Sequence, residues 1–97
     1  PFQIGLINLK SNDEKAKKIA NEIYLSALNL NIDVLYDDKL DNAGVKFSRM
    51  DLIGLPFQFF IGIKAISDNV IEIKNRKTGE VSEVNIDNIL DKIKELV

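Results

Sequence analysis

The sequence predicts an α/β fold in which helices flank a mixed five-stranded sheet in three layers, α/β/α. A strand-forming run, a capped amphipathic helix and a second strand follow one another within residues 2–36, as in a parallel βαβ unit. Two later runs, 70–74 and 80–84, alternate apolar with polar residues and predict an antiparallel hairpin. The full order, β-α-β-α-β-β-β-α, gives three helices and one domain over 1–97, but the order of strands in the sheet stays open.

The first strand and helix are indicated by an apolar run and a capping pattern. Residues 2–9 form an almost unbroken run of strand formers, typical of a buried parallel strand. Ser11 and Glu14 have the spacing of a capping box, which predicts Ser11 as the N-cap. The predicted apolar face of the helix that follows consists of Ala16, Ile19, Ala20, Ile23, Ala27 and Leu30.

Asn29 or Asn31 can end this helix, because asparagine tolerates the left-handed conformation of a helix C-terminus. The second strand is predicted at 32–36. Asp37 and Asp38 follow its carboxyl end, where α/β sheets collect ligands. They could form an acidic Mg²⁺ or phosphoacceptor site, but strands one and three supply no further acids there, so a solvated turn is favoured.

The central stretch predicts a second helix over 45–53, ended by Gly54, and a third strand over 56–61. Residues 62–69 are expected to form a loop or a short helical turn. At about 100° per residue, Phe47 lies on nearly the opposite side of the helix from Val45 and Leu52. Phe47 is therefore expected to face something other than the sheet.

The last helix begins after Asn85 or Asp87, either of which can cap it. It has the clearest apolar stripe in the chain. The stripe consists of Ile86, Ile89, Leu90, Ile93, Leu96 and Val97.

Composition excludes many enzyme classes. With no Cys and no His among 97 residues, the chain cannot form disulfides, thiolate zinc sites or a Ser-His-Asp triad. There is no phosphate-binding glycine loop of the usual spacing. Carboxylate or lysine chemistry remains possible, but most enzyme templates are excluded. Because it begins at Pro1 without Met, we expect it to be a fragment of a larger protein.

Charge and hydropathy limit the partners. A net charge of −2 argues against a general polyanion binder, but it permits local, specific contact with RNA. No apolar run approaches the roughly 20 residues that a membrane helix needs, so no membrane association is expected.

Four side chains suit the reading of a single-stranded base. Phe47 and Asp51 are spaced i,i+4, so a ring could stack on the base while a carboxylate accepts from guanine N1–H and N2. Gln58 could donate or accept a hydrogen bond, and Lys64 could contact a phosphate or guanine O6. From spacing alone a structural role is favoured, with Phe47 in the core and Asp51 capping or paired with a lysine.

Several segments resemble the C-terminal anticodon-binding domain of bacterial prolyl-tRNA synthetases, a domain shared more loosely by other class IIa synthetases. The core K-F-x-x-x-D-L-I-G-x-P is fairly specific to the prolyl branch, and the resemblance covers essentially the whole chain. It rests on P-F-Q-I-G-L-I-N-L (1–9), L-Y-D-D (35–38), A-G-V-K-F (43–47), D-L-I-G-L-P (51–56), I-G-I-K (61–64) and E-I-K-N-R-K-T-G-E (72–80).

The resemblance implies a domain that binds the anticodon of proline tRNA, whose last two letters are G. It implies anticodon contacts at Phe47, Asp51, Gln58 and Lys64. Family members often carry arginine at the position of Gln58 and G-P-K at 62–64. It also implies a catalytic domain elsewhere in the same protein that uses ATP and Mg²⁺, and a homodimeric, cytoplasmic parent enzyme. In this domain it implies no catalytic residue, no metal site and no cofactor.

Two alternatives stay open at this point. The chain could be the equivalent domain of a sister synthetase, for threonine, histidine or glycine, or of a non-catalytic accessory subunit. A flavodoxin-like or receiver-like domain that uses Asp37 and Asp38 is less consistent with the missing acids and nucleotide loops.

Overall fold

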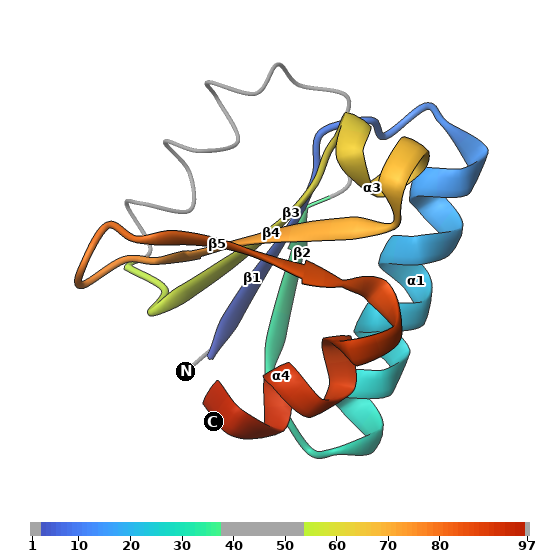
Figure 1. Cartoon of the computed structure of the whole chain (residues 1–97). Coiled ribbons are helices and arrows are strands. Elements are labelled where there is room, and N and C mark those ends of the chain that lie inside the picture. Colours follow the sequence, from blue (N-terminus) through green and yellow to red (C-terminus); the bar gives the residue numbers. More distant parts are fainter. Residues whose placement is uncertain (1–2, 38–53, 97) are drawn as a thin grey trace.

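The computed structural model describes residues 3–37 and 54–96, and the elements below refer to that part of the chain (Figure 1). In chain order they are β1 (Ile4–Asn8), α1 (Glu14–Asn29), β2 (Val34–Asp37), β3 (Phe57–Ile61), α3 (Ile63–Asp68), β4 (Val70–Asn75), β5 (Val81–Asn85) and α4 (Ile89–Leu96). A short 3-10 helix, Ile86–Asn88, leads into α4.

The five strands form one mixed sheet in the order β2-β1-β3-β4-β5. β1 pairs in parallel with β2 and with β3, whereas β3, β4 and β5 pair antiparallel. The predicted α/β class, the mixed sheet and the C-terminal hairpin are confirmed. The helix predicted over 45–53 lies outside the described residues.

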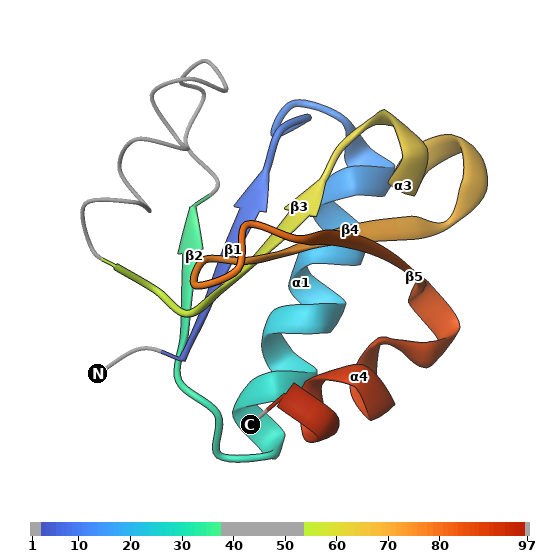
Figure 2. The ribbon, with the colours of Figure 1, turned by 60° about the vertical axis from the view of Figure 1, so that its left-hand side comes forward.

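Helices α1 and α4 lie side by side over one face of the sheet, as both views of the ribbon show (Figure 1, Figure 2). Alternate residues of each strand point to this face because successive side chains of a strand face opposite sides. The main core forms between sheet and helices, and its largest side chain is Phe59, which has no exposed surface. Strand residues in this core are Ile4, Leu6, Val34, Phe59, Ile61, Ile71 and Ile73, and helix residues include Ile19, Ile23, Ile89 and Ile93.

The opposite face of the sheet has its own apolar cluster. Ile7 and Phe60 project there from β1 and β3, and Leu55 joins them from the segment before β3. All three are buried, and Leu9 and Leu35 pack against them. Burial on both faces explains why β1 and β3 appear in the sequence as nearly continuous apolar runs.

Helix α1 is capped by Asp13, so the prediction of Ser11 as the N-cap is wrong. The backbone N–H of Ala16 donates to Asp13 Oδ1 at 3.0 Å, and α1 starts at Glu14. Ser11 instead donates its hydroxyl to the backbone oxygen of Asn8, 2.9 Å away. The physical reason is the turn after β1, in which Asp13 N–H bonds Lys10 oxygen and delays the helix by two residues.

The C-terminus of α1 confirms the prediction of a left-handed asparagine and selects Asn31, whose φ is 59°. Asn31 N–H donates to Leu28 oxygen and Ile32 N–H donates to Ala27 oxygen, each at 3.0 Å. These two bonds make a Schellman motif, which satisfies carbonyls at the helix end.

The remaining boundaries agree with the sequence closely. Residues 62–69 contain α3, which Asn69 ends with a φ of 56°. β3 begins at Phe57, one residue after Pro56. Asn85 provides the cap before the last helix, since its Oδ1 accepts from Asp87 N–H at 2.9 Å.

The left-handed conformation of Asn31 gives a stability prediction. Asn31→Ala should lower the free energy of unfolding by about 1 kcal/mol, because alanine lacks the tolerance of asparagine for positive φ. Asn31→Gly keeps that conformation at no steric cost, so it should stay within about 0.5 kcal/mol of wild type. Urea unfolding measures both, and equal losses for alanine and glycine would contradict the assignment.

Candidate nucleic-acid interface

The sheet face turned away from α1 and α4 presents two rows of side chains. The strand pairings align residues across all five strands, and aligned residues share one face. Among the residues whose side chains are described, one row is Ile7, Phe60, Glu72 and Glu83, and the other is Leu35, Gly5, Gln58, Lys74 and Val81.

Exposure along these rows changes from one side of the sheet to the other. Ile7 has no exposed surface and Phe60 is 7% exposed, whereas Val81, on the edge strand β5, is 54% exposed. Glu83 on the same edge strand is exposed as well. On this face, the β4–β5 half is therefore more accessible to a polar ligand than the β1–β3 half.

Gln58, one of the four predicted site residues, lies in β3 on this face. Its side chain is completely buried, and its Cα partner on β4 is Lys74, which is partly exposed. The side chain of Gln58 is therefore directed to this face of the sheet but is covered by its neighbours. The prediction that it contacts a base stays a prediction.

Lys64, a second predicted site residue, lies in the first turn of α3 and is exposed. Its Nζ lies 2.5 Å from Glu83 Oε2, and the two side chains are 52% and 50% exposed. The hydrogen bond that Lys64 donates to Glu83, and then the negative charge of Glu83, raise the pKa of Lys64 above the ordinary 10.5, with Glu72 and Asp68 adding to the effect. The ammonium is therefore charged at neutral pH.

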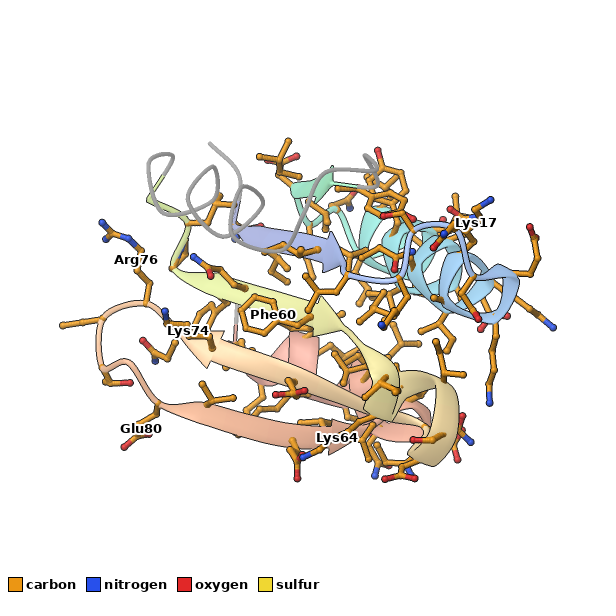
Figure 3. All side chains as sticks on the ribbon, turned by 90° about the horizontal axis from the view of Figure 1, so that it is seen from above. Lys17, Phe60, Lys64, Lys74, Arg76 and Glu80 are labelled. Carbon is orange, nitrogen blue, oxygen red and sulfur yellow. The ribbon has the colours of Figure 1, made fainter. Side chains whose placement is uncertain are left out.

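A second basic group lies toward the hairpin end of the sheet. Figure 3 shows Lys74 and Arg76 there, away from Lys64 near α3. Arg76 donates its backbone N–H to Pro56 oxygen at 3.0 Å. A Cβ placed on Gly54, whose φ is 77°, would lie 3.8 Å from the guanidinium carbon. The Arg76 side chain therefore lies beside Gly54, just before β3.

Phe47 and Asp51, the other two predicted site residues, lie outside the described residues. Glu83 was missed by sequence reasoning. Alternation along the hairpin did predict a polar face, but the pairing of Glu83 with Lys64 joins residues 19 positions apart. That pairing joins a helix to a strand distant in the chain, and no local sequence pattern predicts it.

The described residues offer few other sites. Within residues 3–37 and 54–96, no group of three or more His, Cys, Asp or Glu side chains could hold a metal ion. No helix in the same ranges is long and apolar enough to cross a membrane.

The ion pair gives a pH prediction. Because the folded pKa of Lys64 is raised, the pair should contribute fully below pH 10.5 and lose its contribution as the pH rises through the higher folded value. In an NMR titration of the lysine Cε signals, Lys64 should titrate above 10.5. Glu83→Gln should bring its midpoint back toward the ordinary value, and an unchanged midpoint would contradict the pairing.

Comparisons with known proteins place this chain among domains that bind anticodons. A family model described as the anticodon binding domain matches residues 3–96. The proline–tRNA ligase of Wolbachia sp. subsp. Brugia malayi (strain TRS) is 53% identical over 91 residues, which are 94% of this chain and 21% of that protein. The proline–tRNA ligase of Anaplasma phagocytophilum (strain HZ) is 44% identical over 93 residues, which are 96% of this chain and 21% of that protein.

A solved structure shares the fold. The prolyl-tRNA synthetase from Cryptosporidium parvum, complexed with L-proline and AMP, matches with a TM-score of 0.88 at 24% identity, over 99% of this chain and 20% of that chain. The chain spans about a fifth of the length of the curated relatives that it matches. Because the family model covers nearly every residue, the chain belongs to the anticodon binding domain family.

Proposed function

We propose that this chain is the anticodon-binding domain of a proline–tRNA ligase. The domain binds the anticodon of proline tRNA, and the ligase attaches proline to that tRNA. The observation that carries the proposal is the 53% identity, over 91 residues, to a proline–tRNA ligase. Membership of the anticodon binding domain family supports the same role. A flavodoxin-like or receiver-like role has no comparable support.

The chemistry of the site fits guanine, which occupies the last two letters of proline anticodons. Asp51 would accept hydrogen bonds from N1–H and the N2 amine, and Phe47 would stack on the base. Lys64 brings a charged ammonium to the described part of the same domain, at the exposed side of the sheet face. Gln58, buried between Gly5 and Lys74 in its row, would support that face or reach a base from below.

The rest of the proposed ligase supplies the chemistry of aminoacylation. Activation of proline with ATP and Mg²⁺ belongs to a catalytic domain of the same protein, and residues 1–97 form one separate RNA-binding domain. The ligase is proposed to be a cytoplasmic homodimer that works without a membrane. No step of the reaction is assigned to residues of this chain.

The proposed roles of Phe47 and Asp51 predict a selective loss of tRNA recognition. Phe47→Ala and Asp51→Ala in the complete ligase should each cost about 1–3 kcal/mol in kcat/KM for tRNA. Proline activation measured without tRNA should be nearly unchanged, because it does not involve this domain. If both variants aminoacylate like wild type, the site assignment is wrong.

The identity of the anticodon gives a separate prediction. Replacing either guanine of the last two letters should weaken binding, whereas the sister-synthetase alternative predicts a response to other letters. Inosine lacks the N2 amine, so wild type should prefer guanine to inosine at the position that Asp51 reads. Asp51→Asn should reduce this preference, and an unaltered preference would exclude Asp51 as the reader.

A further inference from the structure

Two carboxylates face each other across strands β4 and β5 on the exposed half of the sheet face. Glu72 and Glu83 are direct cross-strand partners. Like charges in this position destabilise a sheet. The Lys64 ammonium, which comes from α3, binds the outer member of the pair, Glu83.

The surroundings of Lys64 are unfavourable for a phosphate. Glu83 bonds its ammonium, and Glu72 and Asp68 lie close enough to act on its charge. Among the described residues, the Lys64 ammonium lies with three carboxylates, Glu83, Glu72 and Asp68, and their combined charge is negative, which repels an RNA phosphate. An ammonium has three N–H donors, and Glu83 Oε2 accepts from Lys64 with half of each side chain still exposed. Donors therefore remain available to a neutral acceptor.

We propose that Glu83 is a positioning residue that makes Lys64 a directional donor to a base edge, guanine O6 or N7, in preference to a phosphate anchor. The inference rests on the proposed function, which supplies the RNA ligand. Guanine presents O6 and N7 as neighbouring acceptors, and an ammonium can donate to both. Glu83 holds the flexible lysine side chain in place before RNA arrives, which reduces the ordering that binding requires.

Lys74, on the same face, differs from Lys64 in the charge of its neighbours. Its cross-strand neighbours are Gln58 on β3 and Val81 on β5, and both are uncharged. Lys74 lies toward the hairpin end, with Arg76, whereas Lys64 lies near α3 (Figure 3). Its positive charge is consequently better suited than that of Lys64 to attract a phosphate.

The test measures binding of the complete ligase to anticodon stem-loops of proline tRNA at several salt concentrations. The last two letters carry guanine, 7-deazaguanine, which lacks the N7 acceptor, or 2-aminopurine, which lacks O6 and the N1–H donor. Lys64→Ala should reduce the preference for guanine over one of the analogues by about 5- to 100-fold, with the salt dependence unchanged. Lys74→Ala should instead weaken all stem-loops alike and lower the slope of log K against log[salt] by about 0.7.

Glu83→Gln separates positioning from simple charge. Removal of a negative charge should by itself tighten RNA binding, whereas loss of positioning should weaken binding to the guanine stem-loop by about 3- to 10-fold. Discrimination should fall with it, and in a Lys64→Ala background Glu83→Gln should reduce discrimination no further. Glu72→Gln is the matched control, because it removes a charge on the same face without removing the bond to Lys64. It should keep discrimination and bind at least as tightly as wild type.

Once melting temperatures show that the variants are folded, each outcome decides whether Lys64 contacts a base edge or a phosphate. A uniform loss with a smaller salt slope for Lys64→Ala would make Lys64 a phosphate contact and overturn this inference, while the proposed function would stand. Tighter binding by Glu83→Gln with discrimination intact would overturn it as well. A wild-type ligase indifferent to both guanines would refute the proposed function itself, and this inference with it.

Discussion

The pairing of β3 with β1 on one side and β4 on the other is the constraint on which the described structure depends. It joins the parallel half of the sheet to the antiparallel hairpin. Its alternation sends Phe59 into the core beneath α1 and α4, and Phe60 into the apolar cluster on the other face. Because a slip of one residue would exchange the faces of every side chain, two buried faces fix the register strongly. That register also places Gln58 beside Lys74 and Phe60 beside Glu72.

The sequence predicted the elements well because hydrophobic periodicity is a local signal. The strands, α1, the hairpin and α4 all followed from it, and Asn31 followed from the geometry that a helix C-terminus requires. The N-cap failed for an equally local reason. Ser11 has the right type and spacing, but its hydroxyl is used by Asn8 oxygen, and the turn places Asp13 at the helix start instead. Strand order could not be predicted, since it depends on packing between distant segments.

The site was predicted less completely than the fold. Gln58 and Lys64 were predicted from their side-chain chemistry and from a resemblance, and the structure places Gln58 inside the sheet and Lys64 in the exposed first turn of α3. Their surroundings come from non-local pairing. Glu83 reaches Lys64 because β5 aligns with β4. Arg76 lies beside Gly54 because its backbone bonds Pro56, directly after the β3–β4 pairing of Phe57 with Asn75. Composition and residue spacing predict neither of these two contacts.

The net charge of −2 raises the question of how such a domain could recognise RNA at all. A general electrostatic field is a weak source of affinity in a chain of this net charge, and carboxylates lie around the Lys64 ammonium. Directional hydrogen bonds can, provided that donors are held in place before binding and face neutral acceptors. A lysine fixed by a glutamate meets both conditions. Such a lysine attracts phosphates only weakly, but its ammonium is oriented to bond one base. A domain with a negative net charge would therefore gain selectivity from this arrangement, whereas a basic domain would gain affinity.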